Sequence, residues 1–131
     1  MEIAQSVMQV EVEGDSLIAS WPNLKSVNSP EFFKSFVSLF VTIREKEISK
    51  VIIDSGQPNG GFLTDTIINF GLKVVPYTSL KRIALLESTD FYWDNSLLQI
   101  FKYLNSAMDI AIEAKILPNK RAALDWLNKK S

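Results

Sequence analysis

The chain has 131 residues, of which 47% are hydrophobic and 22% charged, and its formal net charge is −1. This length and this balance are typical of one domain with its own core and exclude a disordered chain. The chain has neither Cys nor His, which excludes disulfides, thiol catalysis and metal sites built on sulfur or imidazole.

The first third of the chain predicts a β-hairpin followed by a helix. Apolar and polar residues alternate imperfectly from Ile3 to Glu13, as in a half-buried strand, and Gly14-Asp15 indicates a turn into a returning strand at 17–19. Ser29-Pro30-Glu31 is typical of a helix start. The predicted helix carries an apolar stripe at spacings of three and four residues, formed by Phe32, Phe33, Phe36, Val37, Phe40 and Ile43.

Two buried strands are predicted in the middle of the chain. The β-branched run at 50–54 is typical of a central strand covered on both faces, and 82–86 has the same character. Glycine and proline make 55–61 a loop. Thr64 is the expected N-cap of the next helix, which Pro76 should kink or end.

The last third predicts a helix from about Ser96 to Leu104, a short strand over 109–113 and a closing helix capped by Asn119. The closing helix is expected to pack Ala123, Leu124 and Leu127. The whole order is ββαβαβαβα. It predicts a single α/β domain over residues 1–131, with a mixed, largely parallel sheet of five strands.

Three segments resemble the SpoIIAA-like, STAS-related small bacterial proteins: Val51-Ile52-Ile53-Asp54, the run from Val75-Pro76 to Ala84, and Ala122-Ala123-Leu124-Asp125-Trp126-Leu127. The resemblance implies a mixed sheet wound as βα units, no enzymatic activity, and regulation through a protein partner.

Better-known STAS proteins bind a partner kinase and are switched off by phosphorylation of a serine or threonine in an Asp-Ser-Ser-Gly-like motif. The corresponding region here, 62–67, contains Thr64 and Thr66 but lacks the serine pair and the glycine. We therefore expect no phosphorylation switch, and we expect Thr64 to act as a helix cap.

Polar residues follow the predicted central strands, at the edge where wound α/β sheets bind ligands. Asp54 precedes a loop containing Gly56, and Glu87 follows the next strand. Two such carboxylates could bind Mg²⁺ or share a proton. The interpretation we favour is that Asp54 bonds the backbone of its own loop.

Phe91-Tyr92-Trp93 form an aromatic triplet in a predicted loop at the same edge. An irregular segment cannot turn all three rings inward, so they either anchor the sheet edge or form an exposed contact for a partner. The candidate rim for an interaction or a ligand therefore comprises Asp54, Gly56, Thr64, Thr66, Glu87, Phe91, Tyr92 and Trp93.

These features predict a non-catalytic regulatory or protein-interaction module without a cofactor, which binds a protein partner or a second copy of itself. The alternative is a small-molecule or lipid-like ligand carrier with a pocket at the strand carboxyl ends. A cavity of several hundred Å³ lined by Phe32, Phe36 and Phe40 would favour this alternative.

The sequence also bears on three further questions, which are nucleic-acid binding, membrane insertion and secretion. No stretch combines clustered cations with aromatic residues, so nucleic acid is not an expected partner. No apolar stretch approaches the roughly 20 residues that a bilayer requires. The first residues also lack the pattern of a secretory signal, so we expect a cytoplasmic protein that does not bind membranes.

Overall fold

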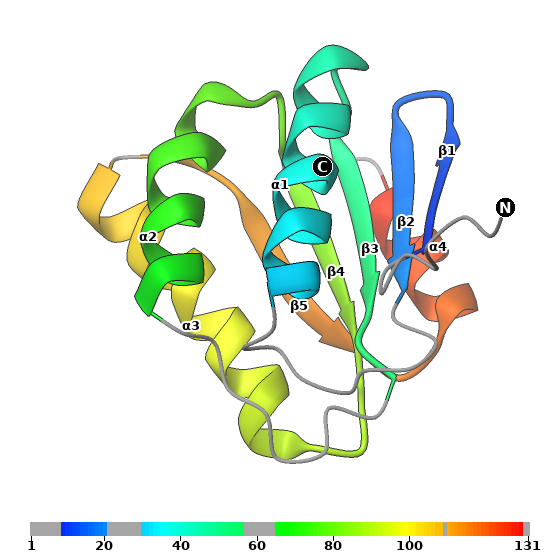
Figure 1. Ribbon diagram of the computed structural model, residues 1–131. Coiled ribbons are helices and arrows are strands. Elements are labelled where there is room, and N and C mark those ends of the chain that lie inside the picture. Colours follow the sequence, from blue (N-terminus) through cyan, green and yellow to red (C-terminus); the bar gives the residue numbers. More distant parts are fainter. Residues whose placement is uncertain (1–8, 21–29, 57–64, 109, 130–131) are drawn as a thin grey trace, which may run out of the picture.

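The computed structural model describes residues 9–20, 30–56, 65–108 and 110–129, which form a sheet with helices on both faces (Figure 1). The strands are β1 (Gln9–Glu13), β2 (Ser16–Ser20), β3 (Lys50–Asp54), β4 (Arg82–Leu86) and β5 (Glu113–Leu117), adjacent in that order. β1 and β2 are antiparallel, and every later pair is parallel. The helices are α1 (Pro30–Glu45), α2 (Asp65–Val74), α3 (Phe91–Met108) and α4 (Lys120–Leu127). The predicted order and the largely parallel five-stranded sheet are confirmed.

The two middle strands are apolar on both faces, as predicted from their β-branched and aliphatic runs. Val51 and Ile83 face α1, α2 and α3 in the larger core, while Ile52 and Ala84 face α4 in the smaller one. All four side chains are at most 2% exposed. The sheet therefore lies between a layer of three helices and a single covering helix (Figure 1).

The strand β1 is more exposed than its alternating sequence predicts. All five residues are exposed, including Val10 at 38% and Val12 at 40%. The half-buried prediction was wrong because β1 is an edge strand that, among the described residues, lies outside both core clusters and contacts mainly β2 (Figure 1). The predicted turn is confirmed, and Gly14 adopts a φ of 63°, which glycine tolerates best.

The hairpin turn is attached to the connection between α1 and β3. The carbonyl of Asp15 accepts the N–H groups of Ser49 and Lys50 at 2.9 and 3.2 Å, and the Ser49 hydroxyl donates to Oδ2 of Asp15 at 2.7 Å. This hydroxyl contact, with the nearby Lys50 charge, holds the pKa of Asp15 below its ordinary value. The turn thus sits in register with the start of β3.

The last strand begins later in the chain than predicted. The alternation over 109–113 suggested a strand there, but β5 spans Glu113–Leu117. Asn105 of α3 explains the difference, because its side chain donates to the carbonyl of Ile112 at 2.6 Å and accepts the N–H of Ile112 at 3.0 Å. Both backbone groups of Ile112 are therefore bonded to a helix instead of a neighbouring strand.

The closing helix α4 begins as predicted. The side chain of Asn119 accepts the N–H of Ala122 at 2.9 Å, which confirms the N-cap. Ala123 and Leu127 are buried, but Leu124 is 38% exposed, so its predicted core position was wrong. Leu124 directly follows Ala123 around the helix and points away from the sheet.

The end of α4 is capped by a strand residue. Nη1 of Arg82 in β4 donates to the carbonyls of Trp126, Leu127 and Lys129 at 3.0, 3.4 and 2.5 Å. The same guanidinium lies 5.6 Å from the centroid of the Trp126 ring and pairs with Glu113 of β5. A cation at the negative end of a helix satisfies carbonyls that have no partner within the helix.

Replacing Asn105 with alanine tests the link that delays β5. Asn105→Ala leaves both backbone groups of Ile112 without their partner, so the free energy of unfolding should fall by about 1 to 3 kcal/mol in urea denaturation. Asn95→Ala is the matched control, because within the described residues its side chain bonds a carbonyl of its own helix and nothing else. An equal loss in both variants would contradict this role of Asn105.

Candidate functional site

The loop after β3 is organised by Asp54, as the favoured interpretation of the sequence expected. Oδ1 of Asp54 accepts the N–H of Gly56 at 3.1 Å. Gly56 has a φ of 62°, in the left-handed region that favours glycine. Asp54 therefore serves to turn its own loop.

Glu87 lies close to Asp54 in the fold, because β3 and β4 end side by side with Asp54 opposite Leu86. Glu87 is exposed, and its N–H donates to the carbonyl of Leu117 at 2.8 Å. Over the described ranges, no three or more His, Cys, Asp or Glu residues group as a metal site would require. The two carboxylates thus lie at one edge without forming a metal centre among the residues described.

Of the two threonines of the candidate rim, Thr66 belongs to the described residues and Thr64 does not. Thr66 is exposed and lies in the first turn of α2. Thr64, the predicted cap of that helix, lies outside the described residues. The helix itself begins at Asp65, and the 3-10 turn Val75–Tyr77 that contains Pro76 follows it directly, as the sequence predicted.

The aromatic triplet is not a loop. Phe91, Tyr92 and Trp93 form the first turn of α3, which begins five residues earlier than the predicted helix start at Ser96. Oδ1 of Asp90 accepts the N–H groups of Tyr92 and Trp93 at 3.0 and 3.1 Å. Asp90 is therefore an N-cap, and its position just before the apolar residues was the signal that the sequence interpretation missed.

A second set of hydrogen bonds fixes the turn before α3. The buried carboxylate of Asp94, 5% exposed, accepts the N–H of Ser88 at 2.9 Å through Oδ2. The Ser88 hydroxyl donates to the carbonyl of Asp90 and accepts its N–H, at 3.1 and 3.0 Å. Carboxylates at both places also suit the positive end of the helix. Residues before and after Phe91 thus fix the backbone at the start of α3.

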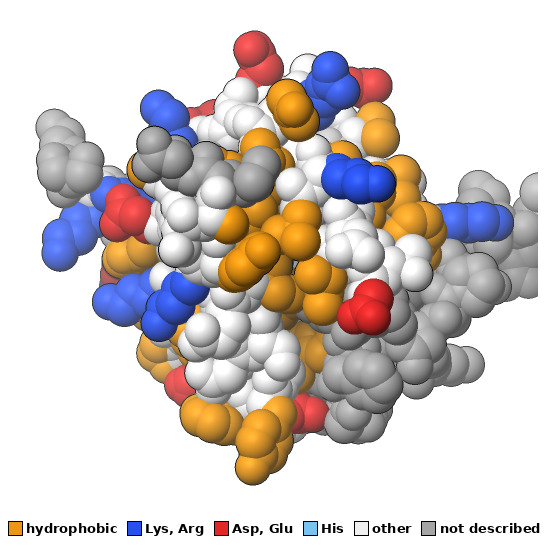
Figure 2. Space-filling view, turned by 90° about the vertical axis from the view of Figure 1, so that its left-hand side faces the viewer, with side chains coloured by type: hydrophobic (Ala, Val, Ile, Leu, Met, Phe, Trp, Pro, Cys, Tyr) orange, Lys and Arg blue, Asp and Glu red, His pale blue; other side chains and the backbone are white. Residues whose placement is uncertain are grey.

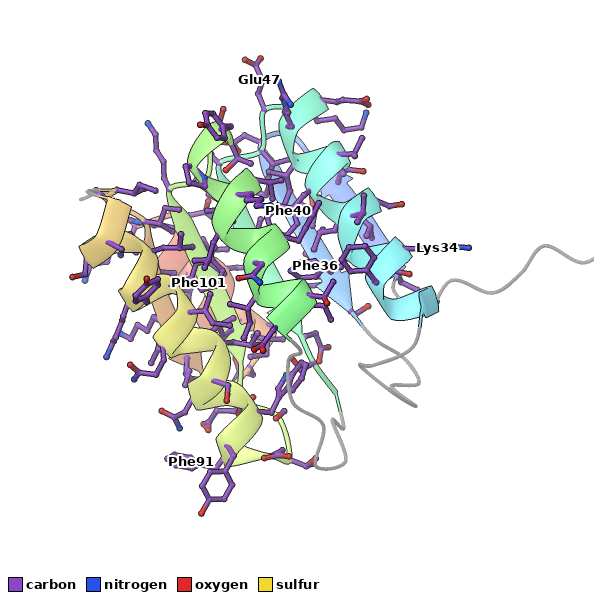
Figure 3. The ribbon with its side chains drawn as sticks, turned by 60° about the vertical axis from the view of Figure 1, so that its left-hand side comes forward. Lys34, Phe36, Phe40, Glu47, Phe91 and Phe101 are labelled. Carbon is purple, nitrogen blue, oxygen red and sulfur yellow. The ribbon has the colours of Figure 1, made fainter. Side chains whose placement is uncertain are left out.

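Helical geometry separates the three rings. Phe91 is 72% exposed and Tyr92 is 82% exposed, whereas Trp93 is only 1% exposed. Successive helical residues point about 100° apart, so two rings project and the third turns inward. Phe91 lies at the end of α3 away from the body of the domain (Figure 3). Trp93 was therefore wrongly placed on the exposed rim, and it belongs to the core.

Phe91 and Tyr92 form one aromatic surface, named here the aromatic pair. Their ring centroids are 6.0 Å apart and their planes meet at 76°, an edge-to-face contact. Figure 2 shows hydrophobic side chains projecting at the lower end of the molecule, with acidic side chains beside them. The pair is therefore an exposed apolar feature in acidic surroundings.

The interior next to this edge is nearly filled. A cavity of about 50 Å³ lies between the sheet and the helices α1, α2 and α3. Its wall is wholly apolar and includes Phe36, Phe40 and Trp93. The indole N–H of Trp93 is buried and has no hydrogen-bond partner among the residues that the structure describes. The cavity is far smaller than the several hundred Å³ typical of a ligand pocket.

The fold and this edge define a small α/β domain that presents an aromatic pair from the start of a helix. Comparison with protein-family models, with curated proteins and with solved structures gives no match. Across the described parts of the chain, every helix falls short of the length and apolar character needed to cross a membrane. The STAS resemblance stays a prediction.

Trp93 and Tyr92 should respond oppositely to truncation, which tests their assignment to core and surface. Trp93→Ala empties a buried site and should lower the free energy of unfolding by about 3 to 5 kcal/mol. Trp93→Phe should cost much less, because the lost N–H has no partner in the described parts of the chain. Tyr92→Ala should change stability by less than about 0.5 kcal/mol. Comparable losses for Trp93→Ala and Tyr92→Ala in chemical denaturation would refute the assignment.

Proposed function

We propose that this chain is a non-catalytic interaction module that binds a protein partner through the aromatic pair. The observation that carries the proposal is the exposure of two adjacent rings, Phe91 at 72% and Tyr92 at 82%. Aromatic side chains supply much of the binding energy at protein interfaces. Two such rings projecting together from a folded domain form a natural anchor.

The anchor is held in place before binding. Its backbone lies in a helical turn, and the Asp90 cap bonds the N–H of Tyr92 directly. The Ser88 and Asp94 bonds fix the preceding turn. A rigid anchor loses little conformational entropy when a partner covers it, which supports a binding role.

The charges around the aromatic pair indicate the chemistry of the partner. Asp90 adjoins the pair in sequence, and Glu87 and Asp65 lie at the end of β4 and the start of α2, on the same edge. Lys120 and Arg121, which begin α4 after β5, lie at this edge too, but on the face of the sheet that α4 covers. The partner surface is therefore a hydrophobic recess bordered by Lys or Arg.

Two further features support a role without catalysis. The chain lacks His and Cys, and the interior cavity of about 50 Å³ leaves little room for a substrate. The order of elements also agrees with the resemblance to STAS-related proteins. We extend the proposal to a cytoplasmic regulatory module of that kind, which acts without a phosphorylation switch at Thr64 or Thr66.

A photo-crosslinking amino acid at position 91 tests the proposal in cells. It should trap one discrete protein, to be identified by mass spectrometry, whereas the same group at Tyr103 should not. Tyr103 is a matched control because it is 60% exposed on the same helix. A product containing two copies of the chain would identify self-association in place of a different partner.

The affinity for the trapped partner should depend on both rings. The double variant Phe91→Ala with Tyr92→Ala should weaken binding by at least about 2 kcal/mol, or about thirtyfold in Kd. Tyr103→Ala should leave Kd unchanged. Equal crosslinking at positions 91 and 103, or an unchanged Kd in the double variant, would show that the aromatic pair is not the contact.

A further inference from the structure

A groove lies between α1 and α2 near the ends of both helices. Its volume is about 150 Å³, and its wall includes Phe40, Val41 and Phe70. Phe40 lies between the two helices in Figure 3. Figure 2 shows hydrophobic side chains gathered in a band across the helical face, with Lys and Arg side chains near it. The groove is at the amino edge of the sheet, opposite the aromatic pair, and is independent of the function proposed above.

The groove is apolar and open to solvent. The rings of Phe40 and Phe70 meet edge to face, with centroids 6.0 Å apart. Val41 on one side is 48% exposed, and Tyr77 on the other is 76% exposed. An apolar cavity of about 150 Å³ accommodates a molecule the size of benzene. The groove therefore has room for one apolar group of about six carbon atoms.

Two cations border the same groove. Arg44 lies in the last turn of α1 and Lys73 in the last turn of α2, and both line the groove. Within the described residues, neither makes an ion pair with a carboxylate. Each cation stabilises the C-terminal end of its own helix. That effect alone does not require both cations to lie beside one apolar groove. A guanidinium and an ammonium together suit a carboxylate, which the arginine fork binds through two hydrogen bonds.

Phe40 lines both this groove and the interior cavity. The same ring lines the wholly apolar cavity of about 50 Å³ beneath it. The Phe40 ring is therefore part of the wall of both the groove and the cavity. The volume of the groove suits one small apolar group better than the several anchors of a peptide helix.

We propose that this groove binds an amphiphilic monocarboxylate, with the apolar part against Phe40 and Phe70 and the carboxylate between Arg44 and Lys73. Octanoate is the probe, and its Kd is measured by NMR titration of the intact chain. Octanol should bind at least about tenfold more weakly, because it lacks the charge that the two cations pair with. Acetate, which lacks the apolar tail, should not bind.

Charge-removing variants locate the site. Arg44→Gln with Lys73→Gln should weaken octanoate binding at least about tenfold. Lys102→Gln with Arg121→Gln removes the same charge from exposed positions on α3 and α4, and Kd should not change. Val41→Trp should block binding by filling the groove, and its exposed position keeps the fold intact, as circular dichroism would check.

Three outcomes would overturn the proposal. Equal affinities for octanoate and octanol would show that the cations do not hold the carboxylate. An unchanged Kd in the Arg44 and Lys73 double variant, in a folded protein, would show that the site lies elsewhere. A groove that ignores octanoate but binds an acidic amphipathic peptide would be a protein contact and not a ligand site.

Discussion

The burial of β3 and β4 on both faces is the constraint on which the rest of the structure depends. Val51 and Ile52 are neighbours that point to opposite sides, and both are at most 2% exposed. Since neither face can remain in water, the chain must supply helices on both. Three helices meet this need on one face. On the other, α4 is the one covering helix among the described residues, and Arg82 at the start of β4 holds its end through hydrogen bonds.

The same winding places the two proposed surfaces at opposite ends of the sheet. Parallel strands joined by helices bring the starts of α2 and α3 to the carboxyl edge and the ends of α1 and α2 to the amino edge. Carboxylates such as Asp90 and Asp94 stabilise helix starts, whereas Arg44 and Lys73 stabilise helix ends. The aromatic pair and the cationic groove therefore lie at opposite ends of one parallel sheet.

Continuous apolar runs predicted the buried strands, whereas alternation alone misjudged the burial of β1 and the bounds of β5, and particular hydrogen bonds were missed. The bounds of β3 and β4 agreed with their apolar runs because burial on both faces leaves a continuous signal. The prediction of where β5 starts failed because the two hydrogen bonds between Asn105 and Ile112 join residues seven apart in the chain. No local sequence pattern indicates such bonds. Trp93 was misplaced because the Asp90 cap was overlooked. The groove could not be predicted, since it depends on how closely α1 and α2 pack.

The exposed edge strand has a consequence for assembly. In the part of the chain that the structure describes, β1 pairs with β2 alone, and an edge strand of this kind offers N–H and C=O groups to another strand, such as β1 of a second copy. Glu11 and Glu13 alternate with Val10 and Val12 along this edge. Strand pairing between two copies would bring these carboxylates together on one face and oppose them at close range. Repulsion between these carboxylates thus opposes the pairing of β1 strands from successive copies. The valines keep the β-branched residues that the hairpin strand needs.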